Sequence, residues 1–410
     1  MKRVFIACLL AALAGVTAGL AVIRLQAVQP QEAVTAAPPG TSDFSPRSIP
    51  PERRATMSQG TEVADGVDAK TVPQFQVDPF WPKPLPNNWL VGQVAGVHVD
   101  KRDHIWIVHR PASLSEREVG ATSNPPISKC CFPAPPVLEF DQDGNLVRFW
   151  GGPSASYEWP ASEHGIHVDK NDFVWIGGNA DKDNQILKFT LDGKFVMQIG
   201  KSGESKGSND TRNLGKPADI QVDEAAREVY VADGYGNRRV IVFDSETGVY
   251  KRHWGAYGKA PSDAPMPAYN PADPPSQQFG SPVHCVRFSN DNLVYVCDRV
   301  NDRYQVFRKD GTFVSESFFQ KDTLLNGSVS DLVLSTDADQ MFIFMADGVN
   351  NELRIVERKS AKTIARIGRP GRMAGQFHVV HDLAIDSRGN LYTTEVNTGQ
   401  RVQKFRRMNP

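Results

Sequence analysis

A repeated unit runs through most of the chain and limits the folds that are open to it. Each copy reads apolar-x-Val-Asp or a close variant, a polar turn, a second apolar run, a polar loop, and a run that ends apolar-x-x-Phe. Nothing in the chain has the pattern of a long amphipathic helix, so each copy is expected to form four short strands. One four-stranded sheet cannot cover its own faces, so the copies must stack on one another. The six copies lie within residues 97–151, 164–193, 218–243, 284–307, 330–356 and 381–405.

Six such sheets that stack radially form an all-β, six-bladed β-propeller. The sixth copy stops at Phe405, one strand short of a full blade. The strand-like run Phe75–Phe80 precedes the first copy and can supply the missing strand, which closes the ring. The asparagine, the basic residue and the apolar-x-x-Phe run of each copy resemble the NHL repeat. This resemblance covers roughly residues 74–405.

The N-terminal part of the chain is expected to lie outside the propeller. Two basic residues precede an apolar run, Val4–Ile23, which is typical of an export signal. A run of this length can also span a bilayer as a retained anchor, so both interpretations of residues 1–24 stay open. Residues 25–72 are rich in Ala, Pro, Gln, Thr and Ser and are expected to form a disordered linker before a propeller at 73–410. We therefore expect an exported protein, periplasmic or extracellular.

The charge balance narrows the expected partners. Lys and Arg total 46 against 47 Asp and Glu, and no basic tract is interleaved with aromatic residues, so we expect no nucleic acid partner. Membrane contact is expected only through the N-terminal segment. The chain is expected to be a monomer that acts on a small molecule or a peptide.

Four cysteines, Cys130, Cys131, Cys285 and Cys297, lie beyond the N-terminal apolar run. They are too few for a disulfide scaffold, and no C-x-x-C spacing indicates a thiolate metal site. A bond between the adjacent Cys130 and Cys131 is expected to be strained, and pairing of either with Cys285 or Cys297 stays open. We expect these cysteines to be structural.

One register of the repeat carries histidine in alternate copies. This register lies at the start of the innermost strand, which lines the channel of a propeller. Alternate blades of a six-bladed ring are a third of a turn apart, so three imidazoles should converge on the channel axis. Three imidazoles with an open fourth position form a catalytic zinc site. A single histidine would more simply be a structural residue, but strict alternation with small residues favours a metal site. The six residues at this register are Ala95, His164, Ala218, His284, Ser330 and His381.

Other polar residues are expected at the same mouth of the channel. Arg110, Tyr235 and Arg299 follow the second strand of their copies. Two guanidinium groups and a phenol beside a metal suit a substrate with a carboxylate, because arginine binds carboxylates through two hydrogen bonds and a phenol can move a proton. Arg239 and Arg303 occupy the basic position of the repeat itself and are expected to brace neighbouring blades.

Three insertions, at 111–134, 203–216 and 256–280, interrupt the repeat. Their positions between strands place them on the channel face that carries the histidines. They can shape a substrate pocket, since loops on a rigid scaffold commonly do so. Packing loops or a surface for a partner are the alternatives, and both stay open.

Several motifs together resemble the peptidyl-α-hydroxyglycine α-amidating lyases, which are six-bladed NHL-type propellers. They include E-H-G-I-H-V-D at 163–169, D-G-Y-G-N-R-R at 233–239 and V-H-D-L-A-I-D at 380–386, in the family's order. The resemblance implies that C–N cleavage of an N-acyl-α-hydroxyglycine-like substrate releases an amide and glyoxylate. The sequence departs from that of the animal enzymes at Gly236, where those enzymes have a disulfide-forming cysteine. The implied residues are His164, His284 and His381 for zinc, and Tyr235, Arg110 and Arg299 for catalysis. A structural calcium ion is implied at the backbone carbonyls of Val97 and Ile166 and the carboxylate of Asp382.

Two other functions remain open on the sequence alone. A propeller with a three-histidine metal site can also be a hydrolase or a lactonase. An NHL propeller without catalytic activity can bind protein or glycan in the cell envelope. Metal content separates this last alternative from both enzymes.

Overall fold

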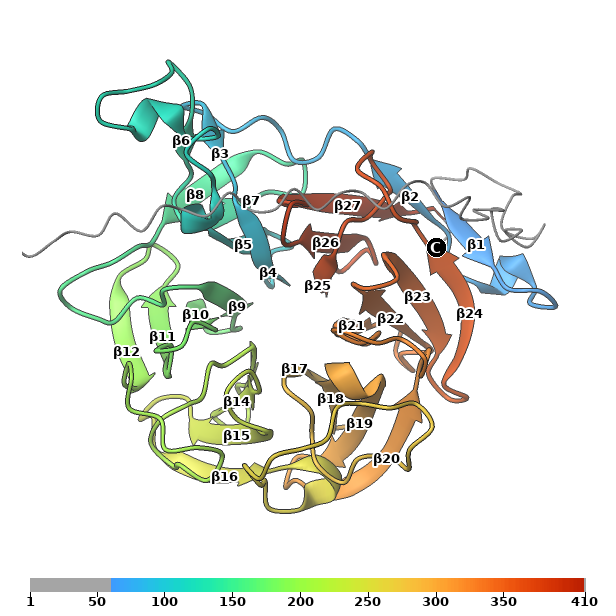
Figure 1. The fold of residues 1–410 in the computed structure, drawn as a ribbon. Helices are drawn as coiled ribbons and strands as arrows, with labels where there is room; N and C mark the ends of the chain where they lie inside the picture. Colours follow the sequence, from blue (N-terminus) through green and yellow to red (C-terminus); the bar gives the residue numbers. More distant parts are fainter. Residues whose placement is uncertain (1–59, 409–410) are drawn as a thin grey trace, which may run out of the picture. The chain divides into compact units, whose positions relative to one another are not determined.

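The computed structural model describes residues 60–408, and these form six antiparallel sheets arranged as blades around a central axis (Figure 1). The predicted six-bladed β-propeller is therefore confirmed. No α-helix occurs among the described residues, and none of their helical turns could cross a membrane. The helical turns are short 3-10 helices: η2 (Ala69–Thr71), η3 (Pro111–Ser113), η4 (Gly120–Thr122), η5 (Ala256–Gly258) and η6 (Arg299–Asn301).

The first three blades each contain four strands that follow the chain from the channel outward. Blade 1 also carries a short parallel pair at its insertion, formed by β3 (Trp89–Leu90) and β6 (Phe132–Pro133). The blade strands are β4 (Gln93–Val99), β5 (Ile105–Arg110), β7 (Val137–Phe140) and β8 (Leu146–Trp150); β9 (Glu163–Val168), β10 (Phe173–Gly178), β11 (Gln185–Thr190) and β12 (Phe195–Gly200); and β13 (Asp219–Asp223), β14 (Glu228–Asp233), β15 (Arg239–Asp244) and β16 (Tyr250–Trp254).

The last three blades follow the same order, and two of them gain a strand from the N-terminal part of the described chain. The strands are β17 (Val283–Phe288), β18 (Leu293–Asp298), β19 (Arg303–Arg308) and β20 (Phe313–Phe318); β21 (Asp331–Leu334), β22 (Phe342–Asp347), β23 (Glu352–Glu357) and β24 (Lys362–Ile367) with β1 (Thr61–Val63); and β25 (Val380–Ile385), β26 (Leu391–Glu395) and β27 (Arg401–Arg407) with β2 (Phe75–Asp78).

The strand β2 closes the ring as predicted. It pairs with β27 so that Val77 faces Phe405, and it becomes the outermost strand of blade 6. The ring of Phe75 packs edge-on against Phe344 of blade 5, with 5.3 Å between ring centroids. A strand that precedes blade 1 and the last strand of the chain are thereby held in one sheet, which closes the ring.

The propeller begins earlier in the chain than predicted, since the linker was expected to extend to residue 72. Thr61–Val63 form β1, which pairs with β24 as a fifth strand of blade 5, and the side chain of Val72 is fully buried. An edge strand of three residues is held mainly by backbone hydrogen bonds, so composition gives little sign of it. The predicted export signal at 1–24 and the linker up to residue 59 lie outside the described residues.

The recurrent Val-Asp pair of the sequence ends the inner strand in a capped turn. In blade 2 the carboxylate of Asp169 accepts hydrogen bonds from the backbone N–H groups of Asn171 and Phe173. It also accepts a hydrogen bond from the indole N–H of Trp175, whose ring is fully buried. One aspartate therefore shapes the turn and fixes the second strand of the blade, as expected for a turn-forming carboxylate.

The four cysteines form two disulfide bonds. Cys285 of β17 bonds to Cys297, which faces it on β18. Cys130 and Cys131 bond to each other within the first insertion, although their adjacency in the sequence argued against this pairing. Neither pair links an insertion to a blade.

Candidate metal centre in the channel

His164, His284 and His381 come together on the channel axis. Their ring centroids lie 4.7 to 5.1 Å apart. One nitrogen from each ring can be chosen so that all three atoms lie within 4.8 Å of one another. Each side chain is almost fully buried. The structure thus places the three histidines of the alternating register where a single ion could contact all of them.

Irregular strand pairing turns these side chains toward the axis. Between the pairs Val283–Asp298 and Cys285–Cys297, strand β17 holds one extra residue, His284. The inner strands of blades 2 and 6 show a similar shift at their histidines. A β-bulge of this kind bends the strand and redirects a side chain. Blade 1 has the same shift at Ala95, whereas the inner strands of blades 3 and 5 pair without one.

The small residues of the alternating register orient the histidines through their backbone carbonyl groups, which the sequence did not reveal. Each histidine Nδ1 lies within hydrogen-bond distance of the backbone carbonyl oxygen at the same register in the next blade. A carbonyl only accepts, so Nδ1 carries the proton and Nε2 keeps its lone pair. The pairs are His164–Ala218 at 2.7 Å, His284–Ser330 at 2.6 Å and His381–Ala95 at 2.8 Å.

The electrostatic surroundings keep the imidazoles neutral. Burial, reinforced by nearby cationic groups, lowers the pKa of His164 and His284 well below 6.5. Burial and Arg110 lower the pKa of His381 to about 3. Neutral imidazole is the form that binds a transition metal, and a hydrogen bond from the other ring nitrogen fixes its orientation. The three histidines therefore fit a metal site with three nitrogen ligands.

In the other clusters of potential metal ligands among the described residues, the ligand atoms are engaged in ion pairs or in a disulfide bond. Asp100, His104 and Glu139 form a network in which His104 Nδ1 lies 2.7 Å from a Glu139 oxygen, and arginines bind both carboxylates. The remaining cluster contains Cys285 and Cys297, which are joined in a disulfide. Within residues 60–408, the three histidines form the candidate whose ligand atoms are neither ion-paired nor part of a disulfide.

Tyr235 lies directly against the histidines. Its hydroxyl oxygen is 3.0 Å from His164 Nε2 and 3.1 Å from His284 Nε2. The second insertion fixes the turn that carries it, because Tyr235 N–H donates to Lys216 O and Gly236 N–H donates to Gly215 O. A side chain at Gly236 would meet Gly215 O at 2.8 Å, which accounts for glycine at this position.

Arg299 is a buried cation with few partners. It follows β18 in η6, and its Nη1 lies 3.4 Å from the hydroxyl of Tyr235. Its Nε is buried without a hydrogen-bond partner among the described residues. Gly327, with a φ of +73°, lets the following loop pass so close to Arg299 O that a side chain could not fit. A buried guanidinium with an unused donor is costly unless a ligand satisfies it.

Arg110 lies at the end of β5 and has only neutral partners. Its Nε donates to Glu163 O at 2.8 Å, and its Nη1 and Nη2 donate to the side chains of Gln93 and Asn179. These three contacts orient the guanidinium without neutralising its charge. Arg110 and Arg299 therefore place two positive charges near Tyr235.

A cavity of about 460 Å³ joins these groups, and its two sides differ in chemistry. Arg110, Asn179, Tyr235 and Arg299 come from blades 1 to 4 and form the polar side. Apolar residues of blades 5 and 6 form the other side, and asparagines line its rim. Asn179 and the apolar residues were not predicted as site residues, although several of them follow the second strand of a blade, as Arg110 does. The apolar lining comprises Leu325, Val349, Val379, Val380 and Val396.

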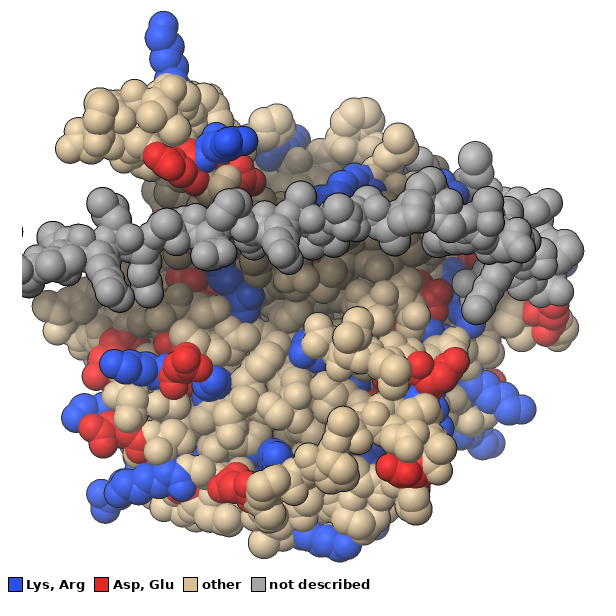
Figure 2. All heavy atoms as spheres, viewed as in Figure 1, with Lys and Arg blue, Asp and Glu red and all other residues tan. Residues whose placement is uncertain are grey.

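The outer face around this cavity carries mixed charge. Figure 2 shows lysines and arginines interspersed with acidic residues over the visible described blades, and neither sign forms a continuous patch.

Arg239 and Arg303 have structural roles, but they brace the insertions rather than neighbouring blades. Arg239 Nε pairs with Asp233 at 2.8 Å, and its Nη1 donates to two carbonyl oxygens of the second insertion. Arg303 Nε pairs with Asp298 at 2.8 Å, and its Nη2 donates to Ser276 O of the third insertion. The basic position of the repeat thus anchors the second and third insertions, neither of which supplies a lining residue of the cavity.

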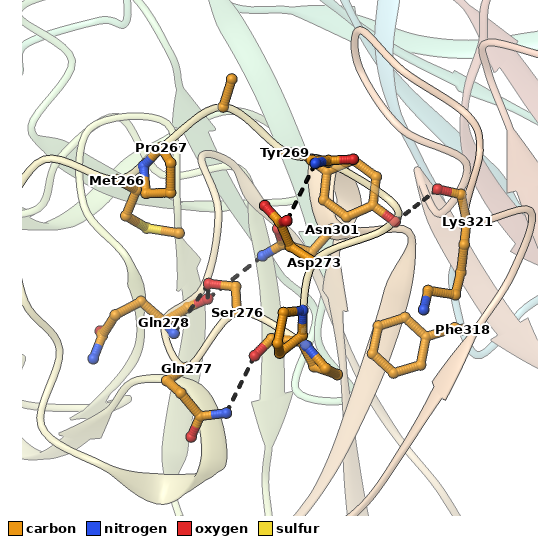
Figure 3. A pocket seen from close by; sticks show the side chains of 14 residues that line it. Met266, Pro267, Tyr269, Asp273, Ser276, Gln277, Gln278, Asn301, Phe318 and Lys321 are labelled. Carbon is orange, nitrogen blue, oxygen red and sulfur yellow. Dashed lines mark hydrogen bonds between the residues drawn. The ribbon is translucent and has the colours of Figure 1, made fainter.

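A second pocket, of about 280 Å³, lies within the third insertion (Figure 3). Tyr269 OH donates to Lys321 O at 2.7 Å, and Asn270 donates to Asp273. Its polar residues thus bond to one another, and no predicted site residue lines it.

The residues expected to hold calcium do not fit that ion. Val97 N–H donates to Asp382 Oδ2 at 2.8 Å, and Arg287 Nη2 lies 3.2 Å from Asp382 Oδ1. Both carboxylate oxygens are thus engaged by protein donors, one of them cationic. Ile166, which was expected to contribute its backbone carbonyl, lies on β9 with its side chain in the core between blades 1 and 2.

Comparison with known proteins places the chain among distant relatives of amidating enzymes and NHL repeat proteins, and no family model matches it. Peptidyl-glycine alpha-amidating monooxygenase B of Xenopus laevis is 26% identical over 255 residues, 59% of this chain and 26% of that protein. A probable peptidyl-alpha-hydroxyglycine alpha-amidating lyase of Caenorhabditis elegans is 23% identical, over 75% of this chain and 80% of that protein. NHL repeat-containing protein 3 of Mus musculus is 25% identical, over 58% of each.

The chain spans about a quarter of the length of the first amidating monooxygenases it matches. Among solved structures, a streptogramin B lyase aligns with 82% of this chain and 98% of its own, at 12% identity and a TM-score of 0.48.

Proposed function

We propose that this propeller is a zinc-dependent lyase that cleaves an N-acyl-α-hydroxyglycine into an amide and glyoxylate. The observation that carries the proposal is the position of Tyr235. Its hydroxyl lies beside the Nε2 atoms of two histidines and beside Arg299, within one cavity. The similarity to amidating lyases supports the same reaction class.

The three histidines would hold the zinc ion through Nε2. When bound, zinc supplies Lewis acidity, which lowers the pKa of a hydroxyl group on the substrate. The Nδ1 contacts to backbone carbonyls keep each ring oriented, so the donor set is arranged before the ion binds.

Arg110 and Arg299 would bind the carboxylate of the substrate. Their positive charges have no acidic side chain in contact among the described residues, and both line the cavity. Binding of the carboxylate there orients the adjacent carbon and its hydroxyl toward Tyr235 and the histidines. The same charges would stabilise glyoxylate as it forms.

Tyr235 would move the single proton that the reaction transfers. Cleavage breaks the bond between the hydroxylated carbon and the amide nitrogen, while the hydroxyl becomes the aldehyde of glyoxylate. The proton leaves the hydroxyl oxygen and finally resides on the amide nitrogen. The phenolic oxygen, held beside the histidines and Arg299, is placed to take and return it.

The apolar side of the cavity indicates the type of acyl group. A substrate whose carboxylate contacts Arg110 and Arg299 would direct its acyl group toward Val349, Val380 and Val396 on the opposite side. No charged residue lies on that side of the lining. We therefore propose an apolar acyl group, such as benzoyl or a medium aliphatic chain.

Replacement of Arg299 tests the binding of the carboxylate. We expect Arg299→Met to reduce kcat/KM by roughly 30- to 5,000-fold, because loss of a buried charged hydrogen-bond partner costs about 2–5 kcal/mol. Arg299→Lys should restore only part of this loss, since lysine cannot form two parallel hydrogen bonds with a carboxylate. Glyoxylate release from α-hydroxyhippurate measures the effect. A kcat/KM for Arg299→Met equal to that of the wild type would exclude this role.

Leu325 tests the apolar side with little risk to the fold, because its side chain is 89% exposed. We expect Leu325→Ala to raise KM for the N-benzoyl substrate by roughly 3- to 10-fold, from loss of about 1 kcal/mol of apolar contact. KM for the N-acetyl analogue should stay constant. Leu324→Ala is the matched control, since Leu324 is exposed but does not line the cavity. Equal effects of Leu325→Ala on both substrates would show that the acyl group lies elsewhere.

A further inference from the structure

One guanidinium occupies the channel directly beyond the histidines. Arg287 lies three positions after His284 on the inner strand of blade 4, and it pairs with Asp219, Asp331 and Asp382. Its Nη2 is 3.0 Å from Asp331 and 3.2 Å from Asp382, and its Nη1 contacts Asp219. These partners come from blades 3, 5 and 6. A single side chain therefore joins four of the six inner strands.

Asp219, Asp331 and Asp382 occupy the same register of the repeat and make the same kind of contact between blades. Each follows the position that carries the histidines and accepts a hydrogen bond from a backbone N–H of the next blade. The distances are 2.9 Å from Val286 to Asp219, 2.9 Å from Leu383 to Asp331 and 2.8 Å from Val97 to Asp382. The carboxylates thus hold neighbouring inner strands together. They need a positive charge at their centre, since unpaired carboxylates in a buried site repel one another.

This cluster separates the channel into two compartments. The cavity beside Tyr235 and a smaller one of about 170 Å³ beyond Arg287 share no lining residue. The smaller cavity is lined by His98, Gln221 and Arg287, which occupy the same register in different blades. In blades 5 and 6 this register carries Val333 and Ala384. Arg287 is therefore the one arginine or lysine at this register of the six inner strands.

We infer that Arg287 is the resident cation of the channel, in the place that a structural calcium ion would otherwise take. A calcium ion on Asp382 would need six to eight oxygen ligands at about 2.3–2.6 Å. It would also have to stand beside a guanidinium that already contacts the same carboxylate, and like charges at that distance repel. The propeller should consequently fold and keep its stability without calcium, whatever reaction it catalyses.

The test measures calcium content and unfolding temperature on zinc-loaded protein in calcium-free buffer. We expect no bound calcium in the wild type by elemental analysis. Its unfolding temperature should not change when millimolar calcium is added. We expect Arg287→Met to unfold at a temperature lower by roughly 5–10 °C, because it leaves buried carboxylates without their partner. Calcium, but not magnesium, should raise the unfolding temperature of this variant by binding in the vacated place.

Arg354→Met is the matched control. Arg354 is more deeply buried, with 2% of its side chain exposed against 13% for Arg287, and it pairs with Asp347 and Glu352 on blade 5. It should lose stability without gaining a response to calcium. The inference is overturned if the wild type retains an equivalent of calcium or is stabilised by it. It is also overturned if folded Arg287→Met gains no stability from calcium. If Arg287→Met does not fold, the calcium content of the wild type and the response of its unfolding temperature to calcium decide whether the inference holds.

Discussion

Replacement of Tyr235 by phenylalanine should reduce kcat by a factor of about 10² to 10⁴, the usual contribution of a positioned acid or base. The phenylalanine ring can occupy the same space, so only the hydroxyl is lost. That hydroxyl lies 3.0 and 3.1 Å from the Nε2 atoms of His164 and His284. Because Arg110 and Arg299 remain, KM should change little. The zinc content should also stay at one equivalent, since the histidines supply the ligands.

Steady-state release of glyoxylate from α-hydroxyhippurate measures this change. Tyr269→Phe is the matched control, because its hydroxyl donates to Lys321 O in the separate pocket of the third insertion. It should leave kcat unaltered. An unchanged kcat in Tyr235→Phe would assign proton transfer to another group. A lowered zinc content in that variant would instead assign Tyr235 to the metal.

His284→Ala should lose both the metal and turnover. It removes one of three nitrogen ligands and leaves Ser330 O without its imidazole partner. Changes in the outer hydrogen bonds of a metal ligand alone weaken metal binding by about 10–100-fold, so loss of a ligand should exceed that range. Dialysed protein should therefore hold far less than one equivalent of zinc, and glyoxylate release should fall to the rate in buffer.

His253→Ala provides the control, since His253 lies on β16 and bonds to Tyr250 away from the channel. Circular dichroism would establish that both variants are folded. His381→Ala repeats the test from a second blade. Retention of a full equivalent of zinc by folded His284→Ala would rule out the three-histidine site.

The sequence predicted the fold well because each blade repeats a local pattern. The Val-Asp pair marks the turn after the inner strand, and the alternating apolar runs mark the strands, so six copies define six blades. The closing strand was predictable because the sixth copy lacked one strand. In contrast, β1 was not predicted, because three edge residues pair through their backbone and the valines of this segment, Val63, Val67 and Val72, are scattered among polar residues without strand alternation.

The site could be predicted in part from register alone. Register identified His164, His284 and His381, because residues at one position of a repeat must occupy equivalent places in the ring. Their roles as zinc ligands stay a prediction. The carbonyl partners of the imidazoles could not be predicted, since they depend on how far one blade is rotated against the next.

Arg287 shows the limit of reasoning by resemblance. Asp382 matched the family pattern for calcium, but its partner Arg287 lies 95 residues earlier and in another blade. Only the closed ring brings the two together. The sequence did contain a sign of this, because Arg287 is a charged residue at an inward-facing register where the other blades carry neutral side chains or histidine.

The measurement that most directly tests the proposed reaction is product formation by zinc-loaded wild-type protein with α-hydroxyhippurate. We expect benzamide and glyoxylate in equal amounts, well above the spontaneous rate in buffer. Removal of zinc should abolish the excess, and its return should restore it. Release no faster than in buffer, by folded protein that holds one equivalent of zinc, would contradict the assignment as an amidating lyase.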